Sequence, residues 1–357
     1  MNPVRLAPPA PDFGHLGRMS DERGLFEHAD HATPRRDHGY CTDDVARLLV
    51  VTSREPDPDP LVSGLAATAL RFLADAQGPT GDSHNRMDER GAWQDRRSID
   101  DCWGRSLWGF GTAAARSPDP AVRRTALAHF ERGAGRRSLW PRTMAFAALG
   151  AAEVVHVDDG NRPALSLLAD AVLIVAGGGP RPGRAPGPGS GSGSDGSWPW
   201  PEPRLAYANA ALPEAMIAAG VALQRDNLRD QGLELLAWLL DQETVAGRLS
   251  VTPVGGRGPD DRRPGFDQQP IEVAALADAC ARAVTLTGDG RWADGLAAAV
   301  AWFLGANDAG IPLWDPATGG GYDGLRADGP NLNQGAESTL ALISTLQHAR
   351  DLAPAVS

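Results

Sequence analysis

The chain has 357 residues, of which 42% are hydrophobic and 22% are charged. These proportions are typical of a soluble globular protein with a sizeable core. The net charge of −11 argues against a broad nucleic-acid-binding surface, which needs clustered positive charge. All 34 basic residues are arginine, because the sequence contains no lysine. This excludes a Schiff-base lysine, a pyridoxal-phosphate anchor and a P-loop lysine.

Three cysteines, Cys41, Cys102 and Cys280, are scattered along the chain and show no CxxC spacing. They are typical of reduced thiols rather than of a disulfide frame or a zinc site. The N-terminal segment MNPVRLAPPAPDF lacks the apolar core of a signal peptide, and no run of residues approaches membrane-spanning length. We therefore predict a cytoplasmic protein without membrane insertion.

Two kinds of helix alternate along the chain. Helices of the first kind open with polar or acidic residues and are then apolar on most sides, which indicates burial. Helices of the second kind are amphipathic, with arginines and acids on one side and Leu, Phe and Trp on the other. The first kind begins near Cys41, Ile99, Trp140, Tyr207, Ile271 and Gln334. The second kind covers, between these starts, residues 61–77, 121–135, 162–177, 228–243 and 291–308.

This alternation predicts an all-α protein in which an inner barrel of about six helices lies inside an outer ring, an (α/α)6 toroid. We expect one domain over residues 1–357, with the polar starts of the inner helices meeting in one cleft. The segment 177–197 is too rich in Gly, Pro and Ser to pack, so we predict a flexible loop there rather than a domain boundary. Non-helical segments at 78–98, 244–267 and 307–333 are expected to wall the cleft.

Six motifs follow one another in a specific order: GLFEHAD to GYCTDDVAR, DDCWGRSLWGFG, WPWPEPRLAYANAALPEA, TPVGGRG, FDQQPIE and DGPNLNQGAESTLA. Together they resemble a bacterial helical family with the six-hairpin glycosidase-like fold, often fused behind or encoded beside family-4-type glycosyltransferases. The resemblance spans about Gly24 to Arg350. It implies an (α/α)6 toroid, an oligosaccharide or glycan as ligand, and a glycosyltransferase as a candidate partner.

Nine acidic residues lie near the predicted starts of the inner helices. They are Asp43, Asp44, Asp100, Asp101, Glu202, Glu214, Asp267, Glu272 and Glu337. An acid in the first turn of a helix commonly caps backbone amides, which contributes about 0.3–1 kcal/mol. Capping explains any single aspartate better than catalysis does. It does not explain why Gln, Asn and Trp recur at the same positions, so we favour a shared site for the whole set.

Glycoside cleavage needs two carboxyl groups across a sugar-sized gap, one protonated and one ionised. We expect Asp44 or Asp101 on one side of the cleft, and Glu337 or Glu272 on the other, as the catalytic acid and base. Glu272 and Glu337 lie in amide-rich openings, and a buried structural role is an equally weighted alternative for both. Carboxyl groups about 5 Å apart suit a nucleophile, whereas 6.5–9.5 Å leaves room for a water molecule.

Two arginines are spaced to support these acids. Arg47 follows Asp44 by three residues and Arg105 follows Asp101 by four, so each pair shares a helix face. An arginine in that position would hold one carboxylate ionised and leave a neighbouring acid free for another task.

Further residues are expected to orient the sugar, because amide side chains suit hydroxyl groups and indole faces stack on sugar C–H groups. They are His38, Asp43, Arg47, Asp100, Arg105, Trp103, Trp200, Glu202, Tyr207, Asn209, Asp267, Gln268, Gln269, Asn333 and Gln334. The histidine-rich segment at 28–38 is turn-like and lacks regular ligand spacing, so we predict neither a metal nor a cofactor.

The sequence therefore predicts a glycoside hydrolase-like enzyme. A non-catalytic glycan-binding or scaffolding partner of a glycosyltransferase is the alternative. A sugar epimerase or isomerase ranks third, because such enzymes usually use histidine pairs in inner helices, and the histidines here crowd into one early loop.

Overall fold

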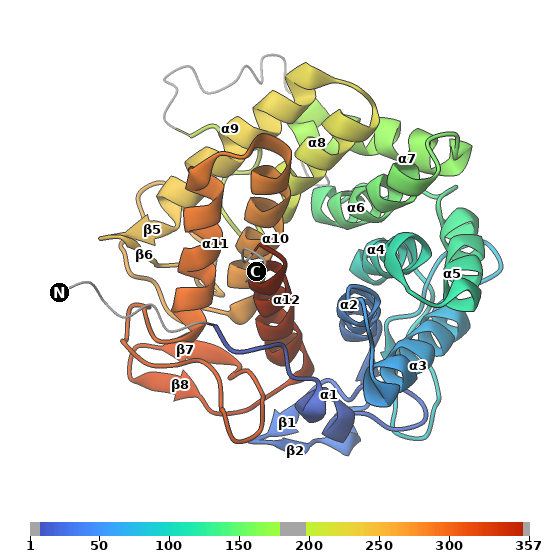
Figure 1. Cartoon of the computed structure of the whole chain (residues 1–357), viewed down its shortest axis with the longest axis horizontal. Coiled ribbons are helices and arrows are strands. Elements are labelled where there is room, and N and C mark those ends of the chain that lie inside the picture. The colour runs from blue at the N-terminus through green and yellow to red at the C-terminus, as the bar shows by residue number, and fades with distance from the viewer. Residues whose placement is uncertain (1–7, 179–197, 353–357) are drawn as a thin grey trace.

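The computed structural model describes residues 8–178 and 198–352 and contains a closed ring of inner helices. The inner helices are α2 (Thr42–Ser53), α4 (Asp101–Arg116), α6 (Pro141–Val157), α8 (Ala211–Ala222), α10 (Pro270–Thr287) and α12 (Ala336–Leu352). Each packs against the next, and the last, α12, packs against the first, α2 (Figure 1). Most residues of these helices are buried, as the apolar pattern predicts.

An outer layer of amphipathic helices surrounds this ring (Figure 1). It comprises α3 (Pro60–Ala76), α5 (Pro120–Gly133), α7 (Arg162–Leu173), α9 (Asp226–Gln242) and α11 (Gly290–Phe303), with a short α1 (Gly14–Arg18) near α12. A π-helical turn, η2 (Ile174–Gly178), continues α7. The predicted all-α (α/α)6 toroid is therefore confirmed, with helix starts within a few residues of those expected. Apart from its first two residues, the predicted flexible loop at 177–197 lies outside the described residues.

The loops before the inner helices carry four short antiparallel strand pairs. They are β1 (Ala29–Asp30) with β2 (Thr33–Pro34), β3 (Tyr40–Cys41) with β4 (Arg86–Met87), β5 (Thr244–Val245) with β6 (Arg248–Leu249), and β7 (Gly324–Arg326) with β8 (Gly329–Asn331). A single 3-10 turn, η1 (Arg36–His38), lies in the first of these loops. The β3–β4 pair links the 78–98 loop to the residues directly before α2. This loop is therefore fixed at the end of the ring where α2 begins.

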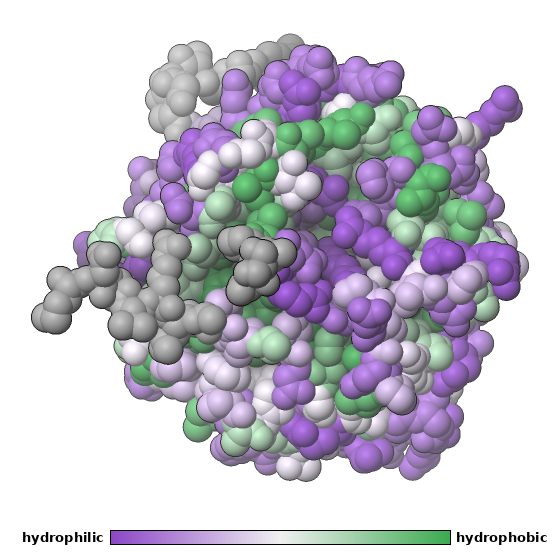
Figure 2. All heavy atoms as spheres, in the orientation of Figure 1, coloured by the Kyte–Doolittle hydropathy of each residue, from purple (hydrophilic) through white to green (hydrophobic). Residues whose placement is uncertain are grey.

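Within the described ranges, no helix is both long enough and apolar enough to cross a membrane. In the space-filling view, hydrophilic residues gather around the centre of the ring, and hydrophobic residues show between charged ones farther out (Figure 2).

Glycines allow α4 and α6 to approach closely. A Cβ atom on Gly150 would lie 2.1 Å from the carbonyl oxygen of Leu107, and one on Gly111 would lie 2.2 Å from that of Gly150. Gly150→Ala must therefore push the two helices apart, and we expect a loss of about 1–3 kcal/mol in unfolding free energy, measured in urea. Gly64→Ala in α3 is the matched control. It has nothing within 4 Å, so it should stabilise by about 0.5–1 kcal/mol. Equal effects would contradict this packing.

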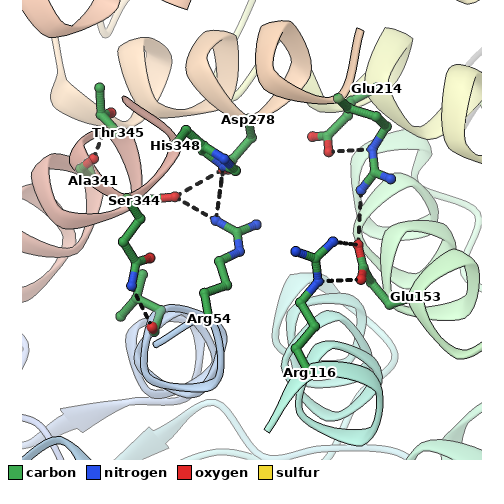
Figure 3. Close-up of polar contacts among 12 residues, drawn as sticks. Arg54, Arg116, Glu153, Glu214, Asp278, Ala341, Ser344, Thr345 and His348 are labelled. Atoms are coloured by element: carbon green, nitrogen blue, oxygen red, sulfur yellow. Dashed lines mark hydrogen bonds and ion pairs between the residues drawn. The ribbon is translucent and has the colours of Figure 1, made fainter. Parts of the chain in front are cut away.

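A buried ion network closes the ring at the ends where α2 and α4 finish (Figure 3). This floor network is contributed by all six inner helices and consists of Arg54, Arg116, Glu153, Glu214, Asp278, Arg282, Ser344 and His348. One half joins Arg54 to Asp278 at 3.0 Å and to Ser344 at 2.8 Å. In the other half, Glu153 accepts from Arg116 at 2.7 Å.

Candidate functional site

An open cavity of about 830 Å³, here called the mouth cavity, lies where α4 and α6 begin. It is lined by Asn85, Arg86, Asp95, Arg96, Ser98, Asp100, Asp101, Cys102, Trp140, Pro141, Arg142, Glu202 and Tyr207. The predicted walling role of the 78–98 loop agrees with this lining. Trp140 is 49% exposed and Tyr207 is 41% exposed, so both present aromatic surface here.

Outer and inner helices begin in different ways. The outer helices α3, α5, α7 and α11 have Asp or Asn at the N-cap, and its side chain accepts from a backbone N–H of the first turn. In the described part of the chain, α2, α4, α6, α8 and α10 have no side-chain cap of this kind. At these five starts the acidic side chains, including that of the N-cap residue Asp100, therefore accept no first-turn backbone N–H of their own helix, which removes the simplest structural explanation for them.

Asp101, the first residue of α4, reaches the mouth cavity with both carboxylate oxygens hydrogen-bonded. Thr143 of α6 donates its hydroxyl to Oδ1 at 2.6 Å, and the Tyr207 hydroxyl donates to Oδ2. Partial burial and the adjacent Asp101 carboxylate raise the pKa of the Tyr207 phenol. Tyr207 therefore remains a donor at neutral pH.

Arg47 of α2 joins two of the predicted catalytic acids. It donates to Asp44 at 2.5 Å and pairs with Glu337 of α12 at 2.7 Å. The predicted Asp44–Arg47 pair is confirmed. Burial, with a further contribution from Glu337, raises the pKa of Asp44 to about 7 against the opposing effect of Arg47. One cation thus serves two carboxyl groups, so this cluster can retain a proton near neutral pH.

Arg105 does not pair with Asp101, and that prediction is wrong. Its Nε lies 4.0 Å from Asp43 of α2, and its guanidinium lies over the Phe146 ring, 4.1 Å from the centroid. Asp43 Oδ1 is buried and has no hydrogen-bond partner within the described ranges. Burial raises the pKa of Asp43 despite Arg105 and Arg47, and the nearby Asp101 and Glu337 carboxylates raise it further. Asp43 therefore has the environment of a proton donor.

A second, narrow cavity of about 40 Å³ runs into the inner ring and is here called the lumen cavity. Arg47, Arg105 and Glu337 line it at one end, and Asp278 and Ser344 of the floor network line it at the other. The consecutive residues Tyr207 and Ala208 line the mouth cavity and the lumen cavity, respectively. Glu337 keeps 38% of its side chain exposed.

Glu272, predicted as catalytic, is buried in the first turn of α10. Its side chain accepts from the backbone N–H groups of Ala208 and Asn209 and from Asn209 Nδ2, the last at 3.0 Å. Burial raises the pKa of Glu272 to about 8, although these three N–H donors favour the ionised form. Glu272 is not among the residues that line either cavity.

Arg142 and Thr143 belong to the site but were missed by the sequence interpretation. Arg142 donates to Glu202 at 2.7 Å, to Asn209 at 3.0 Å and to the carbonyl of Tyr207 at 2.5 Å. The sequence does contain a pattern that could have indicated them, because Arg142 and Thr143 directly follow Trp140 and Pro141 at the start of a predicted inner helix.

Two predicted tryptophan contacts lie in the core. Trp103 is 1% exposed and donates its indole N–H to the carbonyl of Gly133 at 3.3 Å. Trp200 is buried and stacks on Trp238 of the outer helix α9. Neither indole face is free to stack on a sugar in this conformation, so their predicted ligand contacts are not supported.

Three predicted amide contacts are occupied within the protein. Asn209 is 1% exposed, accepts from Arg142 at 3.0 Å and donates to Glu272 at 3.0 Å. The other two are glutamines. Gln268 donates to Asp308 at 2.8 Å and accepts from Trp302. Gln334 accepts from Thr318 at 2.6 Å. Both amides are buried, so they support the loops before α10 and α12 rather than a ligand.

The other predicted binding residues lie at several places around the loops. Asp100 lines the mouth cavity, whereas Gln269 is the N-cap residue of α10. Asp267 lies 3.7 Å from Arg326, Asn333 accepts the His31 backbone N–H at 3.0 Å, and His38 lies 3.7 Å from Asp37. Of these predicted residues, only Asp100 lines a cavity. The other four line neither cavity: Gln269, Asp267, Asn333 and His38.

One set of side chains has the composition of a metal site. Ligand atoms of Glu27, Cys41 and Asp44 lie within 4.8 Å of one another. Arg86 already pairs with Glu27, and Arg47 already pairs with Asp44. A cation there would compete with two guanidinium groups, so the set is a poor fit for a metal.

No family model and no curated protein matches this sequence. Solved structures match over nearly the whole chain. A sugar epimerase from a ruminal bacterium is 13% identical, with a TM-score of 0.68 and 95% of both chains covered. The cellobiose 2-epimerase of Spirochaeta thermophila is 15% identical, with a TM-score of 0.63, 94% of this chain and 93% of that chain covered.

A metagenome-derived glycoside hydrolase family 9 endoglucanase is also similar, with 14% identity and a TM-score of 0.56 over 92% of this chain and 71% of that chain. These structures are (α/α)6 toroids, so the fold of this chain is the six-hairpin glycosidase-like fold. At such low identity the similarity establishes the fold alone.

Proposed function

We propose that this protein is a carbohydrate-active enzyme that hydrolyses a glycosidic bond of an oligosaccharide or glycan at the mouth cavity. The observation that carries the proposal is that acids from the starts of α2, α4 and α12 lie near one another. Asp101 lines the mouth cavity, Glu337 lines the lumen cavity, and Asp43 lies within electrostatic reach of both carboxylates. The exposed rings of Trp140 and Tyr207 offer stacking surfaces for sugar faces.

In this proposal Asp43 donates a proton to the departing glycosidic oxygen as the bond from that oxygen to the anomeric carbon breaks. Asp101 acts on the other side of the ring, either removing a proton from the attacking water or attacking the carbon itself. Water supplies the hydroxyl group of the new reducing end. If Asp101 activates the water, Asp101 takes its proton, and exchange with solvent then returns Asp101 and Asp43 to their starting states. If Asp101 attacks the carbon, water later hydrolyses the glycosyl ester and gives its proton to Asp43. Glu337, held by Arg47, stabilises the positive charge that develops on the sugar ring.

The proposal is tested by incubating the protein with a panel of oligosaccharides in D2O and analysing the products by mass spectrometry. Hydrolysis gives smaller sugars, one of which gains an oxygen atom from solvent. The anomer formed first, identified by ¹H NMR, distinguishes water activation from direct attack. If calorimetry detects binding but no product forms from any bound sugar, the alternative of a glycan-binding module replaces the hydrolase.

An epimerase or isomerase is the second candidate, because the similarity to the sugar epimerase spans 95% of both chains. Its products would keep the size of the substrate and carry deuterium on carbon, so the same experiment identifies it. The described part of the chain places no histidine along either cavity. This is the reason for ranking hydrolysis first. A glycosyltransferase partner and a cytoplasmic location remain proposals from the sequence.

A further inference from the structure

The turn before α8 has a backbone conformation that needs support. Ala208 has a φ of 45°, in the left-handed region that residues other than glycine rarely adopt. It directly follows Tyr207, whose hydroxyl donates to Asp101. The position of that hydroxyl therefore depends on a backbone conformation that the sequence alone does not favour.

Glu272 holds this turn from the side of α10. Its carboxylate binds the backbone N–H groups of both Ala208 and Asn209, and it also binds the Asn209 side chain. A single buried side chain thus satisfies two consecutive backbone donors at the point of strain.

Arg142 holds the same turn from the side of α6. Its guanidinium donates to the carbonyl oxygen of Tyr207 at 2.5 Å and to Asn209 Oδ1 at 3.0 Å. Its third contact, with Glu202 at 2.7 Å, fixes the guanidinium itself. Residues 207–209 are therefore hydrogen-bonded on both sides by side chains from the two neighbouring inner helices.

We propose that Glu272 is a positioning residue, which acts with Arg142 through the 207–209 turn to hold the Tyr207 hydroxyl against Asp101. This proposal rests on the proposed function only for its consequence on turnover. Glu272 itself does not line either cavity, and its carboxylate is occupied by three N–H groups. Its contribution is to keep the Asp101 carboxylate in one orientation by way of Tyr207.

The placement of Tyr207 can be measured without turnover, because the chain has only three tyrosines. Protein carrying ¹³C-labelled tyrosine gives three ring signals, and the Tyr207 signal is identified by its loss in Tyr207→Phe. Asp101→Asn shows how far this signal moves when the hydrogen bond changes. We expect Glu272→Gln to move it in the same direction, while the signals of Tyr40 and Tyr322 stay in place and report an intact fold.

Rescue separates positioning from direct catalysis. Glycine adopts positive φ without penalty, so adding Ala208→Gly to Glu272→Gln should return the Tyr207 signal toward its wild-type position. Where a substrate is turned over, kcat should recover in parallel, while KM changes little in either variant. Arg142→Met acts on the same turn from the other side and is the second variant if Glu272→Gln does not fold. Because the Arg142 guanidinium also lies over the Tyr207 ring, 5.1 Å from its centroid, the part of the shift that Ala208→Gly reverses is the part that reports the turn.

Two results would overturn the inference. In one, Glu272→Gln or, if that variant does not fold, Arg142→Met leaves the Tyr207 signal unmoved. In the other, the signal moves but Ala208→Gly restores neither the signal nor kcat. Failure of the hydrolase proposal looks different: the signals behave as expected, but no oligosaccharide is cleaved.

Discussion

Replacing Asp101 with asparagine is expected to reduce kcat by about 10³-fold, within the range usual for loss of a general base, while sugar binding changes by less than about tenfold. The amide keeps the shape of the side chain, and its single oxygen can still accept from either Thr143 or Tyr207, which donate to different oxygens of Asp101. It cannot accept the proton of an attacking water or form a glycosyl ester. The measurement is kcat on a cleaved oligosaccharide, with the dissociation constant from calorimetry.

Asp75→Asn on the outer helix α3 is the control for the lost charge, because Asp75 is exposed and remote from both cavities. It should behave as wild type. Asp43→Asn should lose activity on ordinary glycosides but keep much of it on dinitrophenyl glycosides, whose leaving group needs no proton. If Asp101→Asn turns over normally, the assignment of this carboxylate fails.

Replacing Asp278 with alanine is expected to lower the free energy of unfolding by about 3–5 kcal/mol at pH 7. Asp278 accepts from Arg54 at 3.0 Å and from Ser344 at 2.9 Å, and lies 2.5 Å from His348. Although burial opposes it, Arg54 and His348 lower the pKa of Asp278 well below its usual value. Its removal would leave the charge of Arg54 buried without its carboxylate, which is why a large effect is expected.

Urea unfolding followed by circular dichroism measures this loss. Asp241→Ala is the matched control, since Asp241 pairs with Arg291 at 2.9 Å on the surface, where its side chain is 70% exposed. That pair should contribute less than about 1 kcal/mol. Similar losses for the two variants would mean that the floor network adds no more than a surface pair does.

The helical architecture could be predicted because a buried helix has apolar residues on nearly all of its sides. The inner helices α6 and α10 are apolar on nearly all sides and begin at Pro141 and Pro270, where proline suits the first turn. Local spacing also predicted the Asp44–Arg47 contact, since residues three apart share a helix face.

The site was harder to predict, because contacts between helices do not follow spacing within one helix. Arg105 was within reach of Asp101, yet it lies beside Asp43 and Phe146 from neighbouring helices. Trp103 follows Asp101 by two residues, and therefore points to a different side of α4, into the core. Glu272 looked like a catalytic acid in sequence, and only its three-dimensional partners show the backbone turn that it binds.

The floor network is harder to predict from the sequence. Glu153 in α6, and Asp278 and Arg282 in α10, are charged residues in mostly apolar stretches, a pattern that indicates buried pairs but not which residues form them.

The contact between Arg54 and Ser344 joins positions 290 residues apart. During translation, Arg54 at the end of α2 therefore cannot form this contact until nearly all the rest of the chain has been synthesised. Until then the apolar surface of the inner helices is exposed on the nascent chain, which favours chaperone binding. We expect production in cells to depend more on this late closure than on the intrinsic helicity of any one segment.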